Sequence, residues 1–94
     1  MTGVLQERLD ALERLLDVVA AGLDRGQRVP CLGHTALWLS EDAEEQEAAI
    51  HGCNACSALV ACRTYVTEFP ERAGTWAEMT PPQQKRAHRK ELAK

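Results

Sequence analysis

Aromatic residues are scarce in this chain, which has one Phe, one Tyr and two Trp among 94 residues. Aromatic side chains normally bury the largest apolar areas, so a core built with so few of them is small. A domain of this length also buries little more than about 60% of the surface that its unfolded chain exposes. Metals, disulfides or a partner usually supply the missing stability in such domains. The four cysteines are the residues here that could provide it.

Long apolar runs are also absent, and no segment approaches the roughly 20 apolar residues of a membrane-spanning helix. Residues 1–17 have no basic n-region and carry acids throughout, which is unlike a secretory signal. We therefore expect a cytoplasmic protein with no membrane partner. In a reducing cytosol, four thiols indicate metal or redox chemistry rather than a permanent disulfide framework.

Charge is distributed unevenly along the chain. Residues 31–80 contain two arginines, Arg63 and Arg72, against eight acids. Residues 81–94 reverse this balance, with five basic residues against Glu91. An acidic body followed by a basic tail predicts two surfaces for two different partners.

No strand-like alternation occurs, so the pattern predicts an all-α fold, a small bundle of about four helices. The first helix is expected over residues 4–23, where apolar residues recur at steps of four and three along one face: Leu5, Leu9, Leu12, Leu16, Val19 and Leu23. We expect this stripe to cover the core of the domain itself. An independent coiled coil is the weaker alternative, because the stripe spans fewer than three full heptads.

Three further helices are predicted from local signals. Ser40 is expected to cap a helix that ends at Gly52. Residues 57–69 form the next helix, which Pro70 stops. The sequence TPPQ at residues 80–83 is typical of a capping box and predicts the last helix. The chain thus divides into an N-terminal amphipathic helix and linker (1–29), a cysteine-containing domain with a Gly-x-Trp turn (30–80) and a basic C-terminal helix (81–94).

The cysteines Cys31, Cys53, Cys56 and Cys62 have the spacing C-x21-C-x2-C-x5-C and are the strongest chemical signal. A single turn brings Cys53 and Cys56 to one metal unit, and a helix carrying Cys62 presents its thiol to the same pocket. Cys31 then closes the site from elsewhere. Four thiolates suit either Zn²⁺ or an iron–sulfur cluster. Because Cys₄ zinc sites usually have two C-x2-C pairs and this chain has one, the spacing places iron–sulfur slightly ahead and leaves zinc open.

Other chemistries fit these residues less well. A thioredoxin-type pair at Cys53 and Cys56 lacks its βαβ setting. Covalent haem attachment would need His after the second cysteine, where this chain has Ser57. His34 and His51 could stand in as ligands, but a single His near a helix end is more often solvated or capping.

The cysteine array, the following AGTWAE segment at residues 73–78 and the basic tail together resemble the WhiB-like (Wbl) family of actinobacteria and their phages. That family has one cysteine, a variable gap, C-x2-C-x5-C, a G-[VI]-W-G-G turn and a basic C-terminal segment. The similarity covers roughly residues 30–90. Two departures stand out: Ala77 and Glu78 replace the two glycines after the tryptophan, and residues 4–23 have no counterpart in the family pattern. If the turn needs positive φ, both replacements are strained.

The resemblance implies an all-α domain organised around a [4Fe–4S] cluster that Cys31, Cys53, Cys56 and Cys62 ligate. It implies a transcriptional regulator, sensitive to redox state or nitric oxide, that docks on the C-terminal region of the principal σ factor of RNA polymerase. In apo forms of the family, former ligands can form disulfides. We expect Gly74, Thr75 and Trp76 to contact σ, with Trp76 as an exposed interface anchor. In an alternative arrangement, Trp76 folds back as a lid on the cluster pocket.

The basic residues of the last helix are predicted to contact the phosphates of promoter DNA: Lys85, Arg86, Arg89, Lys90 and Lys94. The alternative is that they only complement the helix dipole. No residue set reads a base sequence, so promoter choice would come from σ and polymerase.

No motif places a nucleophile beside a base, so we predict no enzymatic activity and no small-molecule substrate. Disulfide reductase activity of the apo form is the weak alternative. The main rival function is a Cys₄ zinc module that mediates protein contacts without redox sensing.

Overall fold

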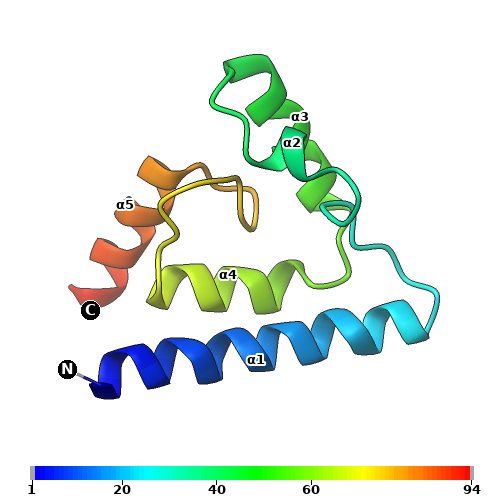
Figure 1. Ribbon diagram of the computed structural model, residues 1–94. Helices are drawn as coiled ribbons and strands as arrows, with labels where there is room; N and C mark the ends of the chain where they lie inside the picture. Colours follow the sequence, from blue (N-terminus) through cyan, green and yellow to red (C-terminus); the bar gives the residue numbers. More distant parts are fainter. Residues whose placement is uncertain (1, 94) are drawn as a thin grey trace.

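The structure is a computed structural model that describes residues 2–93 (Figure 1). These residues form five helices and no strand, which confirms the predicted all-α fold. The helices are α1 (Thr2–Asp24), α2 (Thr35–Trp38), α3 (Ala43–Asn54), α4 (Leu59–Glu68) and α5 (Pro81–Leu92). The single turn α2 is the addition to the four helices that the sequence predicted. Within the described residues, no helix combines the length and the apolar character that crossing a membrane requires.

The helices pack as two units (Figure 1). In the first unit, α1 and α5 each pack against α4, whereas in the second unit α2 packs against α3. The first unit contains the larger core, formed by Ala11, Leu15, Ala58, Tyr65, Val66 and Ala77. The smaller core of the second unit consists of Trp38, Ala49 and Cys53. Cys53, one of the four predicted ligands, is therefore itself part of the smaller core.

Helix α1 does not bury the predicted stripe. Its buried side chains are those of Ala11 and Leu15, which lie roughly a third of a turn or more away from the line through Leu9 and Leu16. Leu5, Leu9, Leu16 and Leu23 remain 46–57% exposed. The stripe therefore lies at the edge of the core, and the prediction that it covers the core is wrong for these four leucines.

Helix α3 begins later and ends later than predicted. Its N-cap is Asp42, whose carboxylate accepts a hydrogen bond of 3.1 Å from the backbone N–H of Glu45. The hydroxyl of Ser40, the predicted cap, instead donates to the Glu45 carboxylate at 2.9 Å. The helix also continues through Gly52, because this glycine serves helix packing and not helix termination. A Cβ at Gly52 would lie 2.5 Å from the Trp38 ring, so only glycine lets the indole approach so closely.

Helix α5 begins as the sequence predicted. Thr80 is its N-cap, and the Gln83 side chain accepts a hydrogen bond of 2.8 Å from the Thr80 backbone N–H. The ring of His88 bonds to the carbonyl of Thr67 at 2.7 Å and so anchors α5 on the end of α4. Helix α4 runs over Leu59–Glu68, slightly shorter than the predicted range 57–69.

A buried polar network holds the α4–α5 connection in place. Gln84, fully buried, accepts a hydrogen bond from the Glu71 N–H at 2.8 Å and donates to the carbonyls of Gly74 and Met79. The Glu71 carboxylate accepts two hydrogen bonds from Arg8 on α1, at 2.8 and 3.0 Å, and one from the Tyr65 hydroxyl at 2.7 Å. Because these groups come from α1, α4 and α5, the network fixes the connection relative to all three helices.

Candidate functional site: a cavity lined by four cysteines

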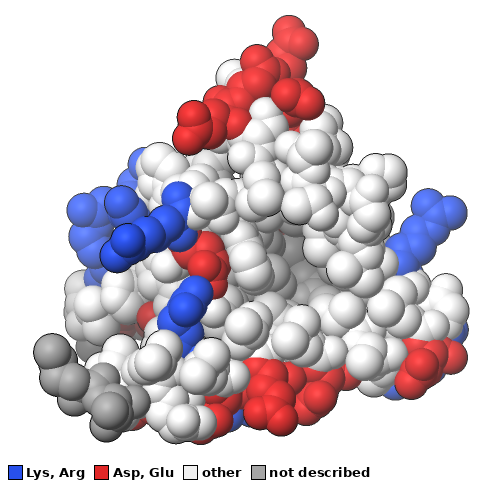
Figure 2. Space-filling view, in the orientation of Figure 1, with Lys and Arg blue, Asp and Glu red and all other residues white. Residues whose placement is uncertain are grey.

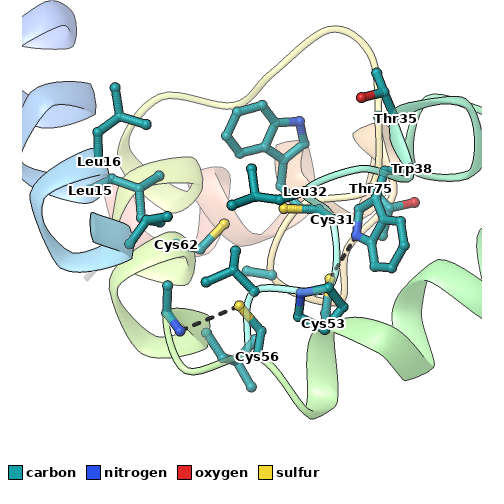
Figure 3. A pocket seen from close by; sticks show the side chains of 18 of the residues that line it. Leu15, Leu16, Cys31, Leu32, Thr35, Trp38, Cys53, Cys56, Cys62 and Thr75 are labelled. Atoms are coloured by element: carbon teal, nitrogen blue, oxygen red, sulfur yellow. Dashed lines mark hydrogen bonds between the residues drawn. The ribbon is translucent and has the colours of Figure 1, made fainter. Parts of the chain in front are cut away.

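The structure brings the four cysteines together around one cavity of about 280 Å³. Cys31 lies in the connection before α2, Cys53 near the end of α3, Cys56 between α3 and α4, and Cys62 in α4. Figure 3 shows their sulfurs directed into the same space. All four thiols are free. The cavity therefore lies where the two helical units meet.

Local backbone geometry positions these thiols. After α3, the Cys56 N–H donates to the Cys53 carbonyl at 3.0 Å, so one tight turn presents both sulfurs. The Ser57 N–H then donates to the Arg28 carbonyl at 2.9 Å. This bond places the segment that leads to Cys31 beside the segment that follows Cys56. Cys62 is on the first turns of α4 and faces back toward the turn.

Hydrogen-bond donors and burial act on the sulfurs in opposite directions. The Trp38 indole Nε1 donates to the Cys53 sulfur at 3.4 Å, and the Ala58 N–H donates to the Cys56 sulfur at 3.3 Å. Such donors stabilise a thiolate. Burial raises the pKa of Cys62 to about 12, neighbouring thiolate charge adds to the rise, and the Ala77 N–H opposes it. Burial also raises the pKa values of Cys31 and Cys56.

The rest of the lining is apolar or uncharged. It includes Leu12, Leu15, Leu16, Val19, Val29, Pro30, Leu59 and both tryptophans. No charged side chain and no histidine of the described residues lines the cavity. His34 and His51, the alternative ligands, are exposed and lie outside this lining. The donor set that the cavity offers a metal or cluster is therefore sulfur.

The sulfurs surround a space and do not converge on a point. Among residues 2–93, no three His, Cys, Asp or Glu side chains are gathered closely enough to hold one metal ion. A tetrahedral zinc ion with Zn–S distances of about 2.3 Å would hold its sulfurs about 3.8 Å apart. The four thiols would therefore have to move inward to bind a single ion.

The segment that contains Trp76 is a tight turn docked on α2. The Thr75 N–H donates to the Trp38 carbonyl at 2.7 Å, and Trp76 and Met79 exchange two backbone hydrogen bonds of 2.9 Å. The two central residues, Ala77 and Glu78, have φ values of 51° and 66°. A type I′ turn requires positive φ at both positions, which glycine adopts most readily. Ala77 and Glu78 therefore occupy backbone positions that are strained for residues other than glycine. This strain was expected from the sequence for a turn that requires positive φ.

Glu78 also gains a partner from its unusual conformation. Its carboxylate forms an ion pair of 2.9 Å with Arg63, the residue that follows Cys62 on α4. The Ala77 N–H meanwhile faces the Cys62 sulfur. Two adjacent strained residues thus connect the turn to the helix that carries the fourth cysteine.

Trp76 combines features of the two predicted arrangements, an exposed interface anchor and a lid on the cavity. Its indole lines the cavity and is tilted by 36° against the Tyr65 ring, with 5.9 Å between the ring centroids, and its Nε1 donates to the Ala73 carbonyl at 3.1 Å. The residue is only partly buried, so it lines the cavity and remains partly accessible to solvent. Gly74 and Thr75, predicted to contact σ with it, are buried against α2. They shape the turn and leave Trp76 as its accessible aromatic.

The predicted DNA-contacting residues lie on a different surface. Lys85, Arg86, Arg89 and Lys90 are exposed on α5, and Figure 2 shows basic side chains gathered over that helix, away from the cavity. Lys94 lies outside the described residues. The basic surface and the cavity are therefore separate.

Sequence reasoning did not identify the residues that hold the site in place. Arg8, Tyr65, Glu71 and Gln84 form the network beneath the Trp76 turn, yet they share no motif or spacing. Comparisons with protein-family models, with curated proteins and with solved structures found no match to this chain. The fold and the site together define a small all-α protein with a four-cysteine cavity, and its function rests on the site itself.

Proposed function

We propose that this protein is a transcriptional regulator of the reducing cytosol that holds a [4Fe–4S] cluster, binds the principal σ factor and contacts promoter DNA. The observation that carries the proposal is the meeting of four thiols from separate segments in one apolar cavity beside Trp76. This arrangement adds a spatial argument to the WhiB-like sequence pattern. No nucleophile–base pair lines the cavity in the described residues, and the proposed role is regulatory.

The cavity supports a cluster better than a single zinc ion. Cys31, Cys53, Cys56 and Cys62 would be its ligands, and a space lies between their sulfurs. N–H donors toward Cys53 and Cys56 and an apolar wall are the surroundings that tune iron–sulfur centres. When bound, a cluster supplies one-electron redox chemistry and iron that oxygen or nitric oxide can attack.

The rim of the cavity supports the proposed σ contact. Trp76 reaches the surface there, and an aromatic residue beside an apolar depression is a common anchor of protein interfaces. Exposed basic residues on α5 support a contact with DNA phosphates at a second surface. Binding of σ and of DNA would then not compete for the same residues.

The test is anaerobic purification of the chain co-expressed with the C-terminal domain of an actinobacterial principal σ factor. We expect a brown complex with about four irons and four sulfides per chain. Cys53→Ala should remove the colour, whereas Trp76→Ala should keep the colour and lose σ.

A colourless protein with one zinc and no bound σ would overturn the proposal. The rival zinc module would then explain the cysteines. To separate loss of binding from loss of folding, circular dichroism of each variant should be compared with the parent protein. The α5 surface is tested independently by Lys85→Gln with Arg89→Gln, which should weaken DNA binding and reduce its salt dependence while σ still binds.

A further inference from the structure

The open side of the cavity continues into a longer apolar surface along α1. Leu16 is part of the cavity lining and is 55% exposed. Leu9 and Leu23 lie seven residues before and after it, and a step of seven residues returns to nearly the same side of an α-helix. Both are nearly half exposed, at 47% and 46%. The three leucines therefore form one row, with its centre at the cavity.

The opposite rim of the cavity is apolar as well. Leu32 and Leu39 flank α2, line the cavity and are 53% and 51% exposed. Figure 2 shows an uncharged hollow between α1 and the α2–α3 unit. Half-exposed leucines on both rims make this a continuous apolar groove and not a set of scattered surface residues.

Acidic side chains border this groove along both long sides. Residues 41–47, which lead into α3, contain five acids and no base. Helix α1 contains five acids against Arg8 and Arg14, and Arg8 is already paired with Glu71. In Figure 2 the acidic groups lie over α3 and along the outer edge of α1, with the uncharged hollow between them.

We propose that this groove binds an amphipathic helix of another protein, whose apolar stripe is flanked by Lys and Arg on both sides. The row of α1 leucines and the rims at Leu32 and Leu39 would receive the apolar stripe, as in other helix-in-groove complexes. The two acidic borders would face the basic flanks and favour this partner over an acidic one. Under the proposed function, the partner helix belongs to σ, so the inference deepens that function and rests on it for the source.

A second copy of this chain fits the groove poorly. Its α1 offers an apolar row too, but that row is bordered by acids, and two acidic helices side by side repel each other. Leu12 and Val19, which alternate with the exposed leucines in the heptad pattern, are already packed against the chain's own core. A symmetric coiled coil would therefore lack two of the six residues of its seam.

The experiment measures binding of two synthetic helical peptides by fluorescence anisotropy, using the anaerobically purified full chain. Both peptides have about 14 residues with leucines on one face; Lys forms the other face in the first and Glu in the second. We expect the Leu/Lys peptide to bind at least about tenfold more tightly than the Leu/Glu peptide. Leu9→Gln with Leu23→Gln should weaken the Leu/Lys peptide about tenfold or more.

Two matched controls test whether the effect is local. Val60 is 77% exposed on α4 and does not line the cavity, so Val60→Gln should leave binding unchanged. Glu44→Lys on the α3 border should weaken binding, whereas Glu68→Lys at the end of α4 should have a much smaller effect. Equal affinity for both peptides, or equal effects of groove and control variants, would overturn the inference.

The same variants separate this inference from the proposed function. If σ binds the parent chain and the double leucine variant equally, the groove inference fails while the proposed function stands. If the Leu/Lys peptide binds the groove but σ does not bind the chain, the proposed function fails and the groove stands. A dimer in sedimentation that the double leucine variant dissociates would identify a second copy as the occupant and overturn the inference.

Discussion

The indole of Trp38 donates a hydrogen bond of 3.4 Å to the sulfur of Cys53 while its ring lies against Gly52. Trp38 therefore donates a hydrogen bond to Cys53, and its ring leaves room only for glycine at position 52. Trp38 thus belongs to the smaller core and also contacts one of the four sulfurs.

Trp38→Phe should keep the fold but lower the affinity of the four cysteines for the metal or cluster that they bind. Removing an outer hydrogen bond to a metal ligand typically costs about 10–100-fold in affinity. The rate at which a chelator bleaches or strips the protein measures this effect. Trp76→Phe is the matched control, because its nitrogen donates to the Ala73 carbonyl and not to sulfur. Equal rates in both variants would mean that the bond to Cys53 has no role in retention.

Gly52→Ala should destabilise the protein, because the added Cβ would lie 2.5 Å from the Trp38 ring inside a packed contact. Overpacking of this kind costs about 1–3 kcal/mol. Urea unfolding measures the loss. Gly3→Ala on α1 is the control: nothing lies within 4 Å of its added Cβ, so it should be neutral or stabilising. A neutral Gly52→Ala would show that the indole can move away freely.

Glu78→Gly should stabilise the protein despite the loss of the ion pair with Arg63. Relief of a left-handed residue gains about 1–2 kcal/mol, and an exposed ion pair typically contributes about 0.2–1 kcal/mol. Glu78→Ala removes the ion pair and keeps the strain, so it should be slightly destabilising. The urea midpoints of the two variants should therefore shift in opposite directions, and a shared downward shift would contradict the strain argument.

Tyr65 should ionise well above the ordinary range. Burial raises its pKa to about 12, and the hydrogen bond to the Glu71 carboxylate adds to the rise, while Arg8 opposes it. Because the unfolded phenol ionises near pH 10, the protonated hydroxyl stabilises the fold fully below about pH 10. That contribution is lost as pH rises through 12.

The chain contains a single tyrosine, so phenolate absorbance reports this group alone. Absorbance and far-ultraviolet circular dichroism should be followed together during an alkaline titration. The phenolate should form only at or beyond the pH at which the fold is lost. A transition near pH 10 in protein that is still folded would contradict the burial of the hydroxyl.

Local chemistry made part of this fold predictable. The capping box at Thr80 needs only neighbouring residues, and the helix starts there as predicted. Gly52 could not be assigned correctly because its role depends on Trp38, fourteen residues away and on another helix. The buried face of α1 could not be predicted either. Ala11 and Leu15 are apolar, as are Leu9 and Leu16, so hydrophobicity alone does not distinguish the two faces of the helix.

The site shows the same division between local and distant information. The spacing of Cys53, Cys56 and Cys62 is a local pattern, and the structure brings these residues together with Cys31. The network of Arg8, Tyr65, Glu71 and Gln84 joins residues up to 76 positions apart along the sequence, and no local pattern marks any of them as a partner of the others.

The separation of the two cores has a consequence for how the protein unfolds. One core consists of residues from α1, α4 and the turn before α5, the other of residues from α2 and α3, and the cysteines lie at their boundary. A group that binds all four sulfurs makes the two cores one cooperative unit, and calorimetry would then record a single transition. Without it, the smaller core can melt first at little cost to the larger one, so the sharpness of the thermal transition itself becomes a readout of occupancy.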